Sequence, residues 1–289
     1  MVASAPLQLA TMMTLPLNEL LPLLLLGACT GFLAGLLGVG GGMIMVPFVT
    51  ILLEQHAFPA GQIIKVAIAT SLTTIVFTAI SSVRAHHRRG GVRWEIAAVL
   101  APGILVGSFA GAQFVGALPA ALIATIFGTF LVWAATRMLR HRAPASPELA
   151  RSLPGKSGMF GAGSLIGAIS AVLGAGGAFL MVPFLTNRGL RPQQAVGTSA
   201  ACGFPIALAG TIGYMVAGRG IELPAGTIGF VYLPALFAIA ATSVLTAPLG
   251  ARLAHALPTD KLKKVFACSL YLMSAYMLWK AWSLSTIAH

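Results

Sequence analysis

Charged side chains are scarce in this chain. Asp, Glu, Lys and Arg make up 8% of its 289 residues, against roughly 25% in soluble domains. Hydrophobic residues make up 57%, and the mean hydropathy is +0.91. This number of charges is too small to cover the surface of a soluble fold of this size. The lipid bilayer must therefore be the solvent for most of the chain. The composition predicts an all-α polytopic membrane protein, because helices satisfy their own backbone hydrogen bonds in lipid.

Carboxylates are the scarcest of these charges. The chain has six, all at the ends of apolar segments or in loops: Glu19, Glu54, Glu95, Glu148, Glu222 and Asp260. Carriers coupled to protons or sodium commonly hold a carboxylate inside the membrane, and cation pores carry acidic rings. The pattern favours an anionic or neutral solute and argues against a carboxylate-based proton relay.

Groups suited to catalysis or metal binding are also few. The three cysteines, Cys29, Cys202 and Cys268, lie in apolar runs without a CxxC pair, which argues against disulfides and zinc. The six histidines lie in loops or tails, and the sequence has no Ser/His/Asp set, zinc motif or P-loop. We therefore expect no enzyme activity, no metal site and no cofactor.

The charge that is abundant is positive, and the net charge is +12. In a soluble protein such an excess would suggest nucleic-acid binding, but membrane proteins gather Lys and Arg in their cytoplasmic loops. The expected partners are therefore a small anionic substrate and the lipid bilayer, and not a nucleic acid. The sequence leaves a homo-oligomer open.

A glycine-rich motif occurs twice. Residues 31–50 and 167–186 are identical at ten of 20 positions, with a constant offset of 136. A threonine-serine pair follows each copy: Thr70-Ser71 and Thr198-Ser199. This duplication predicts two homologous halves, and internal symmetry of this kind is typical of secondary transporters, whose substrate site lies at the repeat interface.

The apolar segments follow the same order in both halves. Those long enough for a membrane helix, about 20 residues, are 20–50, 63–83, 96–115, 119–139, 158–186, 193–217, 224–251 and 264–283. The first transmembrane repeat is then 1–139 and the second 157–289, joined by a basic cytoplasmic linker, 140–156. Each half is expected to hold one long segment broken by glycines and three spanning helices.

The distribution of Lys and Arg decides whether a broken segment crosses the membrane or re-enters on the same side. If residues 158–186 form a re-entrant hairpin, fifteen Lys and Arg lie inside and three outside. If they cross fully, the split is eleven to seven. The positive-inside rule favours the hairpin, and three full spans per half would make the halves inverted repeats. Whether the first long segment, 20–50, crosses or re-enters stays open.

The glycine clusters are the first candidate for the substrate site. They comprise Gly38, Gly40, Gly41 and Gly42 in the first half, and Gly174, Gly176 and Gly177 in the second. A helix that begins at such a break inside the membrane presents unpaired N–H groups and a partial positive charge, which together bind anions. The alternative is close helix packing through small residues.

The threonine-serine pairs are the second candidate. The hydroxyls of Thr70, Ser71, Thr198 and Ser199 can donate to anion oxygens. Hydroxyls in membrane helices also bond to the carbonyl four residues earlier or join neighbouring helices. The duplication favours a binding role for the two pairs, whereas the stripe formed with Thr74, Thr78 and Ser81 leaves both readings open.

The sequence resembles the sulfite exporter TauE/SafE family. The resemblance rests on GLLGVGGGMIMVPF at residues 35–48, its repeat AVLGAGGAFLMVPF at residues 171–184, and the two threonine-serine pairs. It implies a multi-pass carrier in the bacterial inner (plasma) membrane that exports sulfite or small organosulfonates. Gly42 has Ala178 as its counterpart, so the site is expected to be asymmetric. An uncoupled anion channel and a non-transporting membrane assembly subunit are the alternatives.

Overall fold

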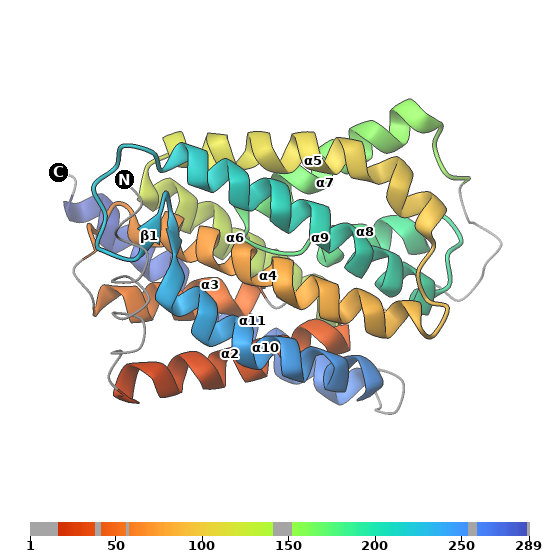
Figure 1. Ribbon diagram of the computed structural model, residues 1–289, viewed down its shortest axis with the longest axis horizontal. Helices are drawn as coiled ribbons and strands as arrows, with labels where there is room; N and C mark the ends of the chain where they lie inside the picture. The colour runs from red at the N-terminus through yellow and green to blue at the C-terminus, as the bar shows by residue number, and fades with distance from the viewer. Residues whose placement is uncertain (1–16, 38–41, 56–57, 141–151, 254–258, 288–289) are drawn as a thin grey trace, which may run out of the picture.

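A computed structural model describes residues 17–37, 42–55, 58–140, 152–253 and 259–287 (Figure 1). The chain is almost entirely helical in these parts. The helices of the first half are α2 (Leu17–Leu37), α3 (Gly42–Glu54), α4 (Ile63–His87), α5 (Trp94–Ala117) and α6 (Ala120–Arg140). Those of the second half are α7 (Lys156–Val172), α8 (Ala178–Thr186), α9 (Pro192–Ala217), α10 (Leu233–Leu253) and α11 (Thr259–Ile287).

Five of these helices, α4, α5, α6, α9 and α10, are long and apolar enough to cross a membrane. The expected all-α polytopic membrane fold is therefore confirmed. The 29-residue α11 is not one of the five. The apolar C-terminal part of α11 contains Lys280, which lowers the mean hydropathy of this helix.

The segment expected to be helical over 224–251 begins differently. Its first residues form a small antiparallel hairpin of β1 (Thr227–Ile228) and β2 (Val231–Tyr232), in which Ile228 pairs with Val231. Gly229 lies in the turn with a φ of +55°. The helix α10 starts only at Leu233, because a positive φ is incompatible with a right-handed helix.

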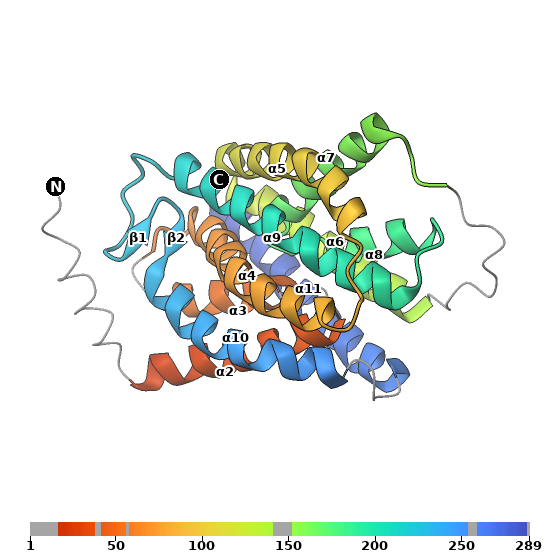
Figure 2. The same ribbon diagram turned by 45° about the vertical axis from the view of Figure 1, so that its right-hand side comes forward.

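The second long apolar segment is broken at its glycine cluster, as the sequence predicted. The first ends as α2 and resumes as α3, and Gly38, Gly40 and Gly41 lie outside the described residues. In the second, α7 begins and α8 ends at the same end of the molecule (Figures 1 and 2). That end also holds the loop between α4 and α5, since a Cβ at Gly197 of α9 would overlap the backbone of Gly91 in that loop.

The two halves exchange contacts in a reciprocal way. The first helix of each half packs along the fourth helix element of the other, α2 on α10 and α7 on α5. Helix α4 packs on α9 at the centre and on α10, while α9 packs on α5. Some of these contacts are close enough to need glycine, as where a Cβ at Gly107 would overlap the backbone of Ser164.

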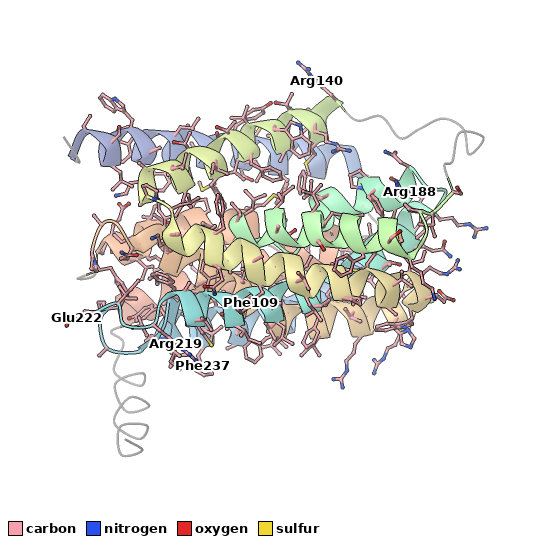
Figure 3. The ribbon with its side chains drawn as sticks, turned by 90° about the horizontal axis from the view of Figure 1, so that it is seen from above. Phe109, Arg140, Arg188, Arg219, Glu222 and Phe237 are labelled. Atoms are coloured by element: carbon pink, nitrogen blue, oxygen red, sulfur yellow. The ribbon has the colours of Figure 1, made fainter. Side chains whose placement is uncertain are left out.

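The charged side chains gather at the two ends of the helical bundle. Figure 3 places Arg140 and Arg188 at one end, and Arg219 and Glu222 at the other. The end with Arg140 also holds the last turn of α4, with Arg84, and the α4–α5 loop, with Arg88, Arg89 and Arg93, so we refer to it as the arginine-rich end.

Candidate functional site

The start of α3 meets the second glycine break inside the molecule. A Cβ added to Gly42, the first residue of α3, would overlap the carbonyl oxygen of Gly174 in the second break. A Cβ on Gly174 would in turn lie 2.8 Å from Val46 of α3 and 3.2 Å from Ile68 of α4. Gly42 and Gly174, 132 residues apart in the sequence, are thus neighbours in space.

Glycine is required at two positions of the second break. Gly174 has a φ of +57° and Gly177 a φ of +76°, conformations that side chains with a Cβ adopt only at a cost. A Cβ on Gly177 would also overlap Ile206 of α9 and lie 3.0 Å from Oγ of Ser170. The chain therefore turns at this point and starts α8 within the protein interior.

The start of α8 presents free backbone donors. Within the described part of the chain, no carbonyl accepts the N–H groups of Gly176, Gly177, Ala178 or Phe179. The N–H groups of Leu180 and Met181 are the first to bond, both to the Gly177 carbonyl. Unpaired N–H groups at a helix N-terminus carry a partial positive charge and bind anions. Two of the expected site residues, Gly176 and Gly177, thus have donors to offer.

The threonines of the two pairs make matching contacts. Oγ1 of Thr70 accepts the backbone N–H of Tyr232, and Oγ1 of Thr198 accepts that of Arg93, each at 3.0 Å. Tyr232 directly precedes α10 and Arg93 directly precedes α5, so each threonine of one half holds the start of a helix of the other half. Both threonines keep one O–H to donate.

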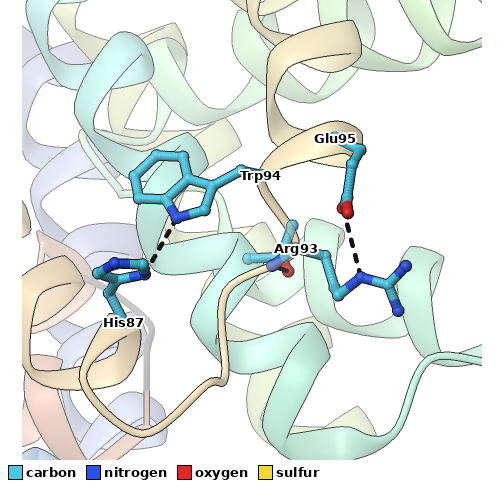
Figure 4. A network of polar contacts seen from close by, with 5 residues as sticks. His87, Arg93, Trp94 and Glu95 are labelled. Carbon is cyan, nitrogen blue, oxygen red and sulfur yellow. Dashed lines mark hydrogen bonds and ion pairs between the residues drawn. The ribbon is translucent and has the colours of Figure 1, made fainter.

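Further contacts hold the start of α5 in place. The Trp94 indole donates to Nδ1 of His87 at 3.1 Å, and the Arg93 side chain pairs with Glu95 at 3.3 Å (Figure 4). These contacts fix the loop whose backbone N–H reaches Thr198.

The serines of the two pairs have no such partners. Ser71 is 0% and Ser199 is 1% exposed, and no described residue bonds to either Oγ. Ser71 shares a helix face with Ile75, whose Cδ1 lies 3.0 Å from the position of a Cβ on Gly42. Ser199 shares a face with Gly203, where an added Cβ would lie 3.4 Å from the Gly176 carbonyl oxygen. Both serines therefore lie on the faces that meet the glycine breaks.

Sequence reasoning missed one hydroxyl, that of Ser170. It is 1% exposed, its Oγ has no partner among the described residues, and it is the group that a Cβ on Gly177 would approach. The offset of 136 pairs Ser170 with Ala34, so the duplication did not point to it. The available signal was its position one turn before the second glycine cluster.

The hydroxyl stripe on α4 has a structural explanation. Thr74 donates to the Thr70 carbonyl and Thr78 to the Thr74 carbonyl, both four residues earlier. Ser81 donates to the Val244 carbonyl of α10 at 3.0 Å. These three hydroxyls therefore bond within α4 or join α4 to α10, as the structural alternative predicted.

The family model described as "Sulfite exporter TauE/SafE" matches residues 23–277. The chain belongs to this family. It is 40% identical over 258 residues to a probable membrane transporter protein of Haemophilus influenzae, covering 89% of this chain and 97% of that protein. It is 27% identical over 263 residues to another from Methanocaldococcus jannaschii, covering 90% and 96%. No solved structure is significantly similar to the chain.

Membership of the TauE/SafE family is consistent with the chemistry of the site. The matched region contains both glycine breaks and both threonine-serine pairs. The family and the relatives are described as membrane transporters, so the chain is a transporter-family protein and not an enzyme. Among the Asp and Glu residues whose side chains the structure describes, none is buried, and within the described residues no cluster of His, Cys, Asp and Glu suits a metal ion. The donors around the breaks are neutral hydroxyls and backbone N–H groups.

Proposed function

We propose that this TauE/SafE protein carries a small sulfur-containing anion, sulfite or an organosulfonate, outward across the bacterial inner membrane. The observation that carries the proposal is the pair of buried, unpartnered serine hydroxyls, Ser71 and Ser199, at equivalent positions beside the two glycine breaks. A buried hydroxyl without a partner costs about 1–3 kcal/mol. Two at duplicated positions indicate a ligand that supplies the missing acceptors.

The donors of the site suit an oxyanion. Backbone N–H groups at Gly176 and Gly177, the N-terminus of α8, and the hydroxyls of Ser71, Ser170 and Ser199 all donate. The equivalent N–H groups of the first break, at Gly38, Gly40, Gly41 and Gly42, complete the proposed set, with the remaining O–H groups of Thr70 and Thr198. Because none of the carboxylates whose side chains the structure describes is buried, a single negative charge would be stabilised there by dipoles alone.

The two halves are proposed to be inverted repeats, each with a re-entrant segment. Helices α4 and α9 run in opposite directions between the ends of the molecule, and α7 with α8 returns to the end at which it began (Figures 1 and 2). The reciprocal contacts of α2 with α10 and α7 with α5 support a two-fold relation between the halves. The arginine-rich end would face the cytoplasm.

Export requires no coupled ion in this proposal. An inside-negative potential drives an anion outward by about 2.3 kcal/mol per charge per 100 mV. None of the Asp and Glu side chains that the structure describes is buried, which is consistent with such an uncoupled carrier. Alternating access would move α8 against α9, with the glycine breaks as hinges.

Counterflow in proteoliposomes tests the proposal. Vesicles loaded with unlabelled sulfite, taurine or sulfoacetate should take up the same labelled anion transiently above equilibrium, because a carrier exchanges one bound substrate for another. An uncoupled channel would equilibrate the label without overshoot. A membrane assembly subunit would show no protein-dependent flux, and either result would contradict the carrier.

A further inference from the structure

One buried cation lies outside the serine site. Lys65, in the first turn of α4, is 7% exposed, and no other Lys or Arg whose side chain the structure describes is buried. Its ammonium donates to the Gly116 carbonyl oxygen at 2.8 Å and lies 5.8 Å from the centre of the Phe230 ring. No described carboxylate pairs with it.

These contacts do not compensate the charge. The Gly116 carbonyl, in the last turn of α5, satisfies one of the three N–H donors of Lys65, and Phe230 lies near the outer limit of a cation–π contact, about 6 Å. The N-terminus of α4 itself repels a cation, because the helix dipole is positive there. A buried charge with one neutral partner is expensive, so the position favours a transient anionic partner.

The position lies on the same helix as Ser71, nearer to the end opposite the arginine-rich loops. Lys65 precedes Ser71 by six residues, which is about 9 Å along the axis of a helix. It lies towards the end opposite the arginine-rich loops. The Phe230 ring beside it packs edge to face on Tyr214, and both rings are buried.

The charge is present in only one half. The threonine-serine pairs align at an offset of 128, which makes Gln193 the counterpart of Lys65. Gln193 is neutral and exposed. A cation needed only to join helices would be expected in both halves. A cation that binds the anion at one end of the transport route is expected in one half only.

We propose that Lys65 is a second anion-binding position, which holds a small oxyanion between the serine site and the end opposite the arginine-rich loops. This second site rests on the proposed function, the transport of an anion. Two N–H donors of the ammonium bind anion oxygens while the third stays on Gly116. This position is closed from solvent in the present structure, since Lys65 is 7% exposed.

The substitution Lys65→Gln removes the positive charge and retains a hydrogen bond to the Gly116 carbonyl. Glutamine keeps an N–H donor for that carbonyl, and it is the residue the second half carries. In oriented proteoliposomes we expect the half-saturating concentration of methanesulfonate at the end opposite the arginine-rich loops to rise about tenfold, as for a lost charged hydrogen bond. At the arginine-rich end the half-saturating concentration should change less than twofold. The Lys65→Arg variant should keep values close to those of the wild type at both ends of the molecule.

Lys280→Met is the matched control. This lysine lies on α11 and is paired with Glu54 at 2.8 Å, so its charge is already compensated. Its loss should leave both half-saturating concentrations unchanged. Unchanged values at both ends for Lys65→Gln, or equal rises at both, would overturn the second site and leave Lys65 as a cap of α5. Absence of any methanesulfonate, sulfite or taurine transport by the wild type would instead refute the proposed function itself.

Discussion

The hydroxyl oxygen of Thr70 accepts the backbone N–H of Tyr232 at 3.0 Å, across 162 residues of sequence. The hydroxyl oxygen of Thr198, in the second half, likewise accepts the backbone N–H of Arg93, in the first half, at 3.0 Å and across 105 residues. Each threonine thus ties its own half to the start of a helix in the other half. The adjacent serines, Ser71 and Ser199, are left without partners in the described structure.

Loss of either threonine hydroxyl should destabilise the fold. Thr70→Val and Thr198→Val preserve side-chain volume but leave a backbone N–H without its acceptor, which costs about 1–3 kcal/mol. Denaturant unfolding in detergent measures this, with Thr70→Ser and Thr198→Ser as controls that keep the oxygen. Stability equal to that of the wild type in both valine variants would show that these bonds do not join the halves.

Loss of either unpartnered serine should weaken binding more than folding. Ser71→Ala and Ser199→Ala each remove a donor to a charged ligand, so affinity for sulfite should fall about tenfold. Ser243→Ala is the control, since Ser243 is also fully buried but bonds to the Ala240 carbonyl of its own helix. Equal affinity in all four proteins, measured by binding to detergent-solubilised protein, would move the site away from the breaks.

Ser170→Ala should act like the other two serine variants if its hydroxyl serves the same ligand. Its Oγ lies beside the Gly177 break and has no described partner. We expect a loss of sulfite affinity of about tenfold, because a charge-assisted hydrogen bond disappears. A gain in stability without a change in affinity would mean that the hydroxyl is merely unpaired.

Gly177→Ala should disrupt the second break. The alanine would take a left-handed conformation at a cost of about 1–2 kcal/mol and would overlap Ile206. Transport should be lost and the unfolding midpoint lowered. Gly155→Ala, directly before α7 with no atom within 4 Å of the added Cβ, should leave both unchanged. A functional Gly177→Ala protein would exclude a tight turn at this position.

Cysteine labelling tests the orientation of the breaks. In a cysteine-free background, Arg188→Cys and Ser152→Cys should both resist an impermeant thiol reagent in intact cells, while Glu222→Cys should react. The reason is that the proposed re-entrant segment keeps residues 152 and 188 on the cytoplasmic side. Labelling of residue 188 but not of residue 152 would favour a full crossing.

Local properties of the sequence were enough for much of this protein. Apolar segment lengths and the scarcity of charge predicted the membrane fold, and α4, α5, α6 and α9 lie within a few residues of the predicted spans. The glycine clusters predicted the breaks, because a positive φ at Gly174 and Gly177 is a property of those residues. The hairpin at 227–232 was missed because its apolar residues continue the pattern of the helix that follows.

Which hydroxyls are free was decided only by the tertiary structure. Thr70 and Ser71 are neighbours with the same functional group, as are Thr198 and Ser199, so composition and spacing do not distinguish them. The burial of Lys65 depends likewise on Gly116 and Phe230, which reach it from other helices and loops. Hydrogen-bond partners and the loss of solvent come from segments far apart in the chain, and these are set only when the two halves pack together.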